Sequence, residues 1–199
     1  MGSAAGRLWR RWVDAPKAVC LLTGVVIGVA ALGAAAWGTV LSGAFDMAAS
    51  VPHGRLAYRI LDTVKLHSVR RHARGIRVPA RFTADEMRAG FRLYDAHCVT
   101  CHGGPGIAPA PLSYGLNPPP PYLINSPDRW RPNELYWIIR NGEKMTAMPA
   151  WKGRLSAREA WNLVAFIEAL RRLDYPGYLA MRQAEAPPPV APSPAPPTP

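Results

Sequence analysis

The stretch Cys98-Val99-Thr100-Cys101-His102 decides the fold of this 199-residue chain. Two cysteines three positions apart lie on one helical turn, so each thiol can bond to a vinyl group of the same haem. A histidine directly after the second cysteine then lies beneath the iron as an axial ligand. C-x-x-C-H is the attachment signature of c-type haem, and the sequence therefore predicts one covalently bound haem c on Cys98, Cys101 and His102.

Two other interpretations of a C-x-x-C pair are weaker. A redox dithiol normally accompanies a βαβ pattern, which this sequence lacks. A zinc site needs two more ligands at a suitable spacing, and the chain has no second C-x-x-C. The third cysteine, Cys20, lies in an uncharged stretch and is predicted to be a small buried apolar residue.

Three helices around the motif are predicted from their start and stop signals. Thr83 with Glu86 and Ser156 with Glu159 are capping boxes, and Pro132 is typical of a first helical turn. No segment shows the alternation of a β-strand, so the sequence predicts an all-α domain with long loops. The expected helices run from Thr83 to about Ala96, from Pro132 to Asn141-Gly142 and from Ser156 to about Leu173.

Residues 141–151 contain two candidates for the sixth iron ligand, Met145 and Met148. The chain resembles class I cytochromes c, in particular small membrane-anchored bacterial monohaem cytochromes, in the order of its features. These are C-x-x-C-H after a first helix, a proline-rich loop, a middle helix ending in glycine and then Met148-Pro149-Ala150-Trp151. The resemblance covers about Phe82–Leu173, half of the chain. It implies the class I cytochrome c fold around one haem, with Met148 as the distal ligand and Met145 as the alternative.

Histidines outside the motif are further possible ligands. His97 is tied beside Cys98 and does not easily reach the opposite face of a haem. The other three precede the predicted domain, and they are His53, His67 and His72.

The resemblance also implies structural detail. The first and last helices should cross closely at Gly90 and Tyr94 on one side and Phe166 and Leu170 on the other. A backbone carbonyl in Pro105–Pro109 should accept the hydrogen bond of His102 Nδ1, and the loop Asn117–Leu123 should cover one haem edge. Arg131 stands where such sequences often have a Ser or Thr cap.

The N-terminal part predicts a membrane anchor. From Ala18 to Phe45 the chain has 28 residues without a charge, which span about 42 Å as a helix and exceed a bilayer core of about 30 Å. Basic residues precede this stretch, so the N-terminus is expected in the cytoplasm and the haem domain on the periplasmic side of the bacterial inner membrane. A cleaved signal peptide is the alternative, with Ala34-Ala35-Ala36 as its cleavage site.

The net charge of +11 lies mostly outside the predicted haem domain. Residues 46–81 hold eight basic and two acidic side chains, a net +6, and apolar residues at helical spacing predict an amphipathic helix over roughly Gly54–Ala73. This segment is a candidate surface for anionic lipid or an acidic partner subunit, or a solvated helix face. The expected organisation is a cytoplasmic 1–17, a transmembrane anchor 18–45, a basic juxtamembrane segment 46–81, a haem domain 82–182 and a Pro/Ala-rich disordered tail 183–199.

These features together predict an electron-transfer protein and not an enzyme. His/Met ligation fills both axial positions of the iron, and the thioether favours the ferrous state. The expected role is a carrier in a periplasmic respiratory chain, or the cytochrome subunit of an oxidase or dehydrogenase complex. Its expected partners are the membrane and redox proteins, with no nucleic acid and no small-molecule substrate. The alternatives are a haem enzyme with a labile methionine and a haem-based sensor.

Overall fold

The structure is a computed structural model that describes residues 4–44, 46–124 and 129–185, with side chains from Lys17 onward. The chain divides into two compact units, Met1–Val51 and Pro52–Pro199. Of the predicted tail, residues 186–199 lie outside the described residues.

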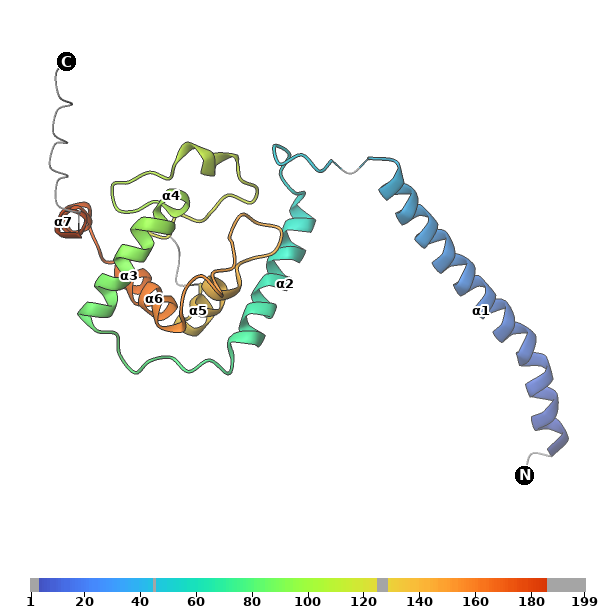
Figure 1. Ribbon diagram of the computed structural model, residues 1–199. Helices are drawn as coiled ribbons and strands as arrows, with labels where there is room; N and C mark the ends of the chain where they lie inside the picture. Colours follow the sequence, from blue (N-terminus) through green and yellow to red (C-terminus); the bar gives the residue numbers. More distant parts are fainter. Residues whose placement is uncertain (1–3, 45, 125–128, 186–199) are drawn as a thin grey trace, which may run out of the picture. The chain divides into compact units, whose positions relative to one another are not determined.

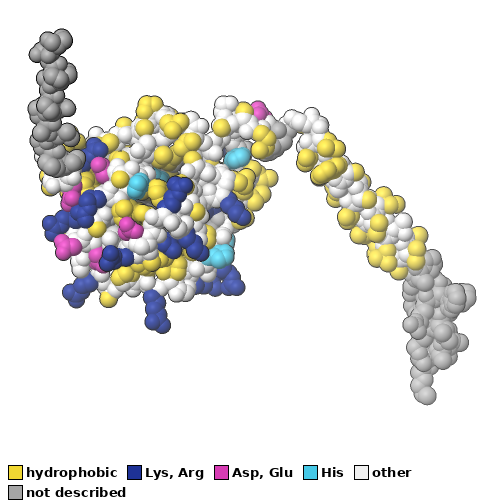
Figure 2. All heavy atoms as spheres, viewed as in Figure 1, with side chains coloured by type: hydrophobic (Ala, Val, Ile, Leu, Met, Phe, Trp, Pro, Cys, Tyr) yellow, Lys and Arg dark blue, Asp and Glu magenta, His cyan; other side chains and the backbone are white. Residues whose placement is uncertain are grey.

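The first unit is built on one long helix, α1 (Ala4–Leu41). Its segment Lys17–Leu41 has 25 residues with a mean hydropathy of 2.3, and none of its side chains is buried. Figure 2 shows apolar side chains along this segment. Within the described residues it is the one helix long and apolar enough to cross a membrane, and a signal sequence would share both properties. The helix ends four residues before the predicted limit at Phe45.

The second unit is helical, and its described residues form no β-strand. The predicted all-α fold class is therefore confirmed. Figure 1 shows α3, α5 and α6 gathered together, with α2 on one side and α7 on the other. The elements are α2 (Arg55–Ala73), α3 (Ala84–His97), α4 (Val99–His102), the 3₁₀ turn η1 (Pro111–Gly115), α5 (Pro132–Asn141), α6 (Ala157–Leu170) and α7 (Tyr175–Glu185).

The crossing of α3 and α6 forms the centre of the core. Gly90 lies against the backbone of Asn162, where a Cβ atom would overlap the Asn162 carbonyl oxygen and come within 2.9 Å of Phe166 Cβ. Tyr94 packs on Phe166 with 5.1 Å between the ring centroids. Both capping boxes at the starts of these helices are present. The predicted close crossing of the first and last helices is confirmed.

Helix α5 begins at Pro132, as predicted. Arg131 stands before it and cannot cap it with its side chain, because a guanidinium has no hydrogen-bond acceptor. Glu134 compensates in part, since its carboxylate accepts a hydrogen bond from the Arg131 backbone N–H at 2.8 Å. Glycine at position 142 ends the helix with a φ of 66°.

The sequence did not predict helix α7. Helix α6 ends at Leu170, not near Leu173, and after a short turn α7 runs to Glu185, three residues into the range 183–199 assigned to the tail. Tyr178 of α7 is fully buried, 5.4 Å from the ring centroid of Phe91. Burial of one large aromatic ring therefore fastens α7 to the core.

Helix α2 packs against α5 and belongs to the same compact unit. Val69 and Ala73 are buried, and the amide of Asn133 donates a hydrogen bond to the Ala73 carbonyl at 2.9 Å. Arg129 Nη2 lies 2.7 Å from Asp62 Oδ2. The predicted helix over 54–73 is present, and it is docked on the domain that follows it.

Candidate haem-attachment site

The five motif residues form a tight helical turn between two elements. Cys98 ends α3, and its carbonyl accepts hydrogen bonds from the backbone N–H groups of Cys101 at 3.1 Å and His102 at 2.9 Å. Both cysteines are free and partly buried. The structure therefore brings the two predicted thiols and the predicted histidine together on one turn of backbone.

The orientation of the His102 ring is set by the proline-rich loop. His102 Nδ1 lies 2.9 Å from the carbonyl oxygen of Pro121. A carbonyl oxygen can only accept, so Nδ1 carries the proton and Nε2 keeps its lone pair for a metal. The prediction that the acceptor lies within Pro105–Pro109 is wrong. The acceptor is the carbonyl of Pro121, sixteen residues after Pro105, where the loop returns to the ring.

Burial also keeps the ring in its ligand form. It lowers the pKa of His102, while the Pro121 hydrogen bond and the Glu143 carboxylate act in the opposite direction. The net effect favours neutral imidazole, which is the form that binds iron.

Burial keeps Cys98 in its thiol form. Burial raises the pKa of the Cys98 thiol to about 12, and the neighbouring Cys101 adds to this shift. A structural zinc ion needs four ligands, and its cysteine ligands bind as thiolates. Among the residues described, no group of three or more His, Cys, Asp or Glu side chains is placed to hold a metal ion.

Two tyrosines hold the backbone that follows the ligand histidine. The Tyr94 hydroxyl donates to the Gly103 carbonyl and the Tyr122 hydroxyl donates to the Gly104 carbonyl, both at 2.8 Å. Gly103 has a φ of 66°, and a side chain there would overlap the ring of Tyr122. The loop that supplies the Pro121 carbonyl is thus locked to the turn it supports. Tyr122 lies in the loop Asn117–Leu123 that the sequence singled out, but its hydrogen bond to Gly104 was not predicted.

Met148 is presented by a segment with a defined backbone. Its N–H donates to Thr146 Oγ1 at 3.0 Å, and its carbonyl accepts from the Glu143 N–H at 3.2 Å. A Cβ at Gly142 would lie 2.7 Å from the Met148 carbonyl oxygen. Only glycine at position 142 therefore lets the backbone there approach the backbone of Met148 so closely. Such anchoring suits a side chain that has to hold a fixed position.

The two methionines of this segment differ in environment. Met148 is partly buried, whereas the Met145 side chain is 70% exposed and its backbone has a φ of 60°. A side chain directed into solvent is a poor candidate for a buried axial ligand. Position in the structure therefore favours Met148.

The histidines outside the motif have other contacts. The His97 ring packs on Trp151 with 5.1 Å between centroids, and the His72 ring stacks on Trp137 at 5.4 Å. His67 is exposed, and His53 lies in the segment before α2. None of these contacts directs a second imidazole towards the His102 ring.

The donor chemistry of the turn fits haem c. Two free thiols three residues apart supply the covalent attachment, and one neutral imidazole with an available Nε2 supplies a nitrogen ligand. A partly buried thioether on a fixed loop is the soft ligand that accompanies histidine in cytochromes c. This set matches haem better than zinc or a redox dithiol.

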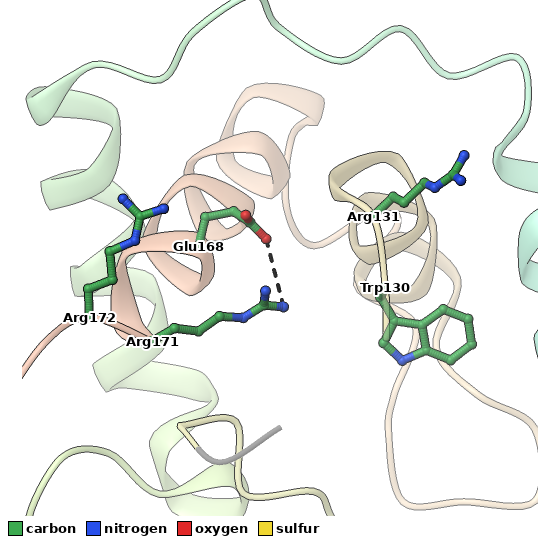
Figure 3. Close-up of a pocket in the computed structure, with 5 residues that line it drawn as sticks. All are labelled: Trp130, Arg131, Glu168, Arg171 and Arg172. Atoms are coloured by element: carbon green, nitrogen blue, oxygen red, sulfur yellow. Dashed lines mark ion pairs between the residues drawn. The ribbon is translucent and has the colours of Figure 1, made fainter. Parts of the chain in front are cut away.

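A separate basic hollow lies elsewhere in the domain, as Figure 3 shows. Glu168 Oε1 lies 3.9 Å from Arg171 Nη2 there, and burial raises the pKa of Glu168. None of the predicted haem residues lines it, so it is distinct from the attachment turn. It has a volume of about 400 Å³ and is lined by Trp130, Arg131, Glu168, Arg171 and Arg172.

Comparison with known proteins agrees with the geometry of the turn. The family model of cytochrome c oxidase, cbb3-type, subunit III matches residues 85–167, which include the C-x-x-C-H turn and the Met-Pro-Ala-Trp segment and exclude α1, α2 and α7. No curated protein matches the chain. The cofactor of the matched family is covalently attached haem c, and its domain is that of an electron-transferring cytochrome. With the all-helical fold of the domain, this match supports a class I c-type cytochrome domain over residues 85–167.

Proposed function

We propose that this protein is a membrane-anchored monohaem cytochrome that carries single electrons in the periplasmic respiratory chain of a bacterium. The hydrogen bond from His102 Nδ1 to the Pro121 carbonyl is the observation that carries the proposal most directly, because it leaves Nε2 available for iron. The haem, when bound, supplies one-electron iron chemistry. The protein holds it, orients its ligands and limits access of water to it.

Four residues carry the binding in this proposal. Cys98 and Cys101 form the thioether bonds, His102 is the proximal ligand, and Met148 is the distal ligand. With both axial positions filled by protein groups, the iron has no open position for a substrate. This ligand set supports electron transfer rather than catalysis, and the protein acts as a carrier or as a non-catalytic subunit of an oxidoreductase.

The membrane arrangement follows from the N-terminal unit. Residues 18–45 form the anchor, residues 1–17 stay in the cytoplasm, and the juxtamembrane segment 46–81 leads to the haem domain 82–182 on the periplasmic side of the inner membrane. The apolar segment Lys17–Leu41 and the basic residues before it support this topology. The matched family is named for an oxidase subunit, which makes a place beside a terminal oxidase one form of the proposed role.

The ligand assignment is tested with the two methionines of one loop. Met148→Ala should open the sixth position, so that the ferrous protein binds CO rapidly and the reduction potential falls. Met145→Ala is the matched control and should change neither property. The opposite pattern would assign the ligand to Met145, and rapid CO binding by the unaltered protein would reject the carrier role.

The attachment site is tested by haem staining of a denaturing gel. Cys98→Ser and Cys101→Ser should each weaken the staining, because each removes one thioether bond. Cys20→Ser is the control and should retain full staining. Undiminished staining in both motif variants would reject this site.

A further inference from the structure

Helix α2 exposes a continuous apolar stripe that the domain does not cover. Leu56, Ile60 and Val64 follow one another at intervals of four residues and therefore lie on one face of the helix. Their side chains are 73%, 53% and 60% exposed. Aliphatic side chains grouped in this way are unusual on a helix that already has a packed face.

The packed face of α2 lies on the opposite side. Val69 and Ala73 are buried, and Asp62, the one acidic residue of the helix, is bonded to Arg129 of the domain. Domain contacts therefore occupy the face away from Leu56, Ile60 and Val64. The exposed stripe is not part of the domain core.

The same face becomes basic towards the end of the helix. In helical order the apolar positions are followed by His67, Arg71 and Arg74, all exposed. We call the six residues Leu56, Ile60, Val64, His67, Arg71 and Arg74 the outer stripe. In Figure 2 the edge of the domain formed by α2 is apolar near the end where the chain enters it and carries Lys, Arg and His side chains towards the other end. No acidic side chain interrupts the stripe.

We propose that the outer stripe is a membrane-interfacial surface that rests on anionic lipid. In this arrangement Leu56, Ile60 and Val64 enter the boundary between headgroups and acyl chains, and Arg71 and Arg74 lie on anionic headgroups. The inference rests on the proposed anchor. It adds that the juxtamembrane helix itself contacts the bilayer and so restricts the orientations of the haem domain.

The covalent connection to the anchor favours lipid over a protein groove. Residues 42–54 separate the end of α1 from the start of α2, and 13 extended residues reach at most about 45 Å. The apolar half of the stripe is the half nearest to the anchor along the chain. The net charge of +6 over residues 46–81 complements an anionic surface.

Nitroxide labels on the full, haem-loaded chain test this inference in nanodiscs. Cys98 and Cys101 are consumed by haem attachment in the proposed function, so a Cys20→Ser background leaves one engineered cysteine as the only labelled site. One label replaces Ile60. The matched control replaces Leu179, an apolar residue of α7 that is 36% exposed. Discs of phosphatidylcholine alone are compared with discs containing phosphatidylglycerol.

In anionic discs the label at position 60 should be accessible to oxygen and shielded from a water-soluble nickel relaxant, while the label at position 179 stays accessible to nickel. Arg71→Gln with Arg74→Gln should return the label at position 60 to water. Each arginine near an anionic surface contributes roughly fivefold to the docked population, so the pair should lower the docked-to-free ratio roughly 25-fold.

The outcomes separate this inference from the anchor on which it rests. A label at position 60 that stays in water while the chain remains in the discs would overturn the inference and leave the anchor intact. A label that becomes shielded only when a second protein is present would assign the stripe to a protein partner and equally overturn it. Loss of the chain from the discs would overturn the anchor itself.

Discussion

The ammonium Nζ of Lys65 lies 3.7 Å from Oε2 of Glu143, which joins helix α2 to the loop that presents Met148. Glu143 also donates its backbone N–H to the Met148 carbonyl at 3.2 Å. Its carboxylate acts on the His102 ring through its charge. One ion pair therefore connects the juxtamembrane helix with the loop that carries the proposed distal ligand.

Removing the positive charge of this pair and removing its negative charge should shift the reduction potential in opposite directions. Lys65→Met removes a positive charge and should lower the potential, because the ferric state becomes relatively more stable. Glu143→Gln should raise it. A unit charge roughly 10 Å away near a protein surface gives shifts of about 20–70 mV, measured by potentiometric titration.

The exposed pair formed by Arg88 and Asp85 is the control for this experiment. The charged atoms of this pair lie 3.0 Å apart at the start of α3. Arg88→Met or Asp85→Asn should leave the reduction potential nearly unchanged. If Lys65→Met and Glu143→Gln shifted the potential in the same direction, loosening of the Met148 loop would explain the result and the charge argument would be wrong.

Local signals in the sequence were sufficient for most helices. Capping boxes at Thr83 and Ser156 and the proline at position 132 fix helix starts through contacts within one turn, so they are visible without a structure. Helix α7 also has a local start signal, because Asp174 accepts the Gly177 N–H at 2.9 Å, but Gly177 itself disfavours a helix and the segment was not predicted as one. Burial of Tyr178 and the ion pairs of Arg182 with Asp95 and of Glu185 with Arg92 join it to α3.

Long-range features were harder to predict from the same sequence. Pro121, whose carbonyl accepts the hydrogen bond of His102, lies 19 positions after it in the sequence. No periodicity in the sequence indicates which proline of this segment lies next to the ring. Periodicity did locate a helix around Leu56, Ile60 and Val64. It did not show that Val69 and Ala73 would be the buried residues, because a hydrophobic pattern identifies a face of a helix and not the surface that covers it.

Gly90→Ala should destabilise the protein although alanine favours helix by about 1 kcal/mol. The added Cβ would overlap the Asn162 carbonyl oxygen, which belongs to backbone and cannot rotate away. Overpacking of this kind costs about 1–3 kcal/mol of unfolding free energy, measured by guanidinium unfolding of the haem-loaded protein. Gly75→Ala is the control, because nothing lies within 4 Å of its Cβ position. Equal stability of the two variants would contradict the close crossing of α3 and α6.

Tyr178→Ala should cost about 3–5 kcal/mol of unfolding free energy, because it leaves a cavity against Phe91 and Phe166. Tyr178→Phe keeps the ring and removes only the hydrogen bond from the hydroxyl to Asp95 Oδ1 at 3.1 Å, so it should cost about 1 kcal/mol. Guanidinium unfolding measures both. If Tyr178→Phe cost as much as Tyr178→Ala, the hydroxyl and not the ring would hold α7.

The ion pair between Asp62 and Arg129 should make the docking of α2 sensitive to acid. The hydrogen bond and charge of Arg129 hold the pKa of Asp62 below its usual value of 3.8, although burial opposes this shift. A lowered pKa in the folded state means that the contribution of Asp62 is fully present above about pH 4. It is lost as the pH falls through the pKa of the folded protein.

Asp62→Asn isolates this contribution. With side chains 26% and 34% exposed, the pair should contribute no more than about 1 kcal/mol at pH 7. The difference in unfolding free energy between the unaltered protein and Asp62→Asn should therefore be constant from pH 7 to pH 5 and shrink progressively as the pH falls below about 4. Asp85→Asn serves as the control, because the Asp85 side chain is 90% exposed and should show a smaller difference.

Hydrogen exchange of the α2 amides locates the effect. Exchange at pH 7 should be faster in Asp62→Asn than in the unaltered protein. Unchanged exchange would mean that the other contacts of α2, among them buried Val69 and Ala73 and the Asn133 hydrogen bond, hold it in place without the ion pair.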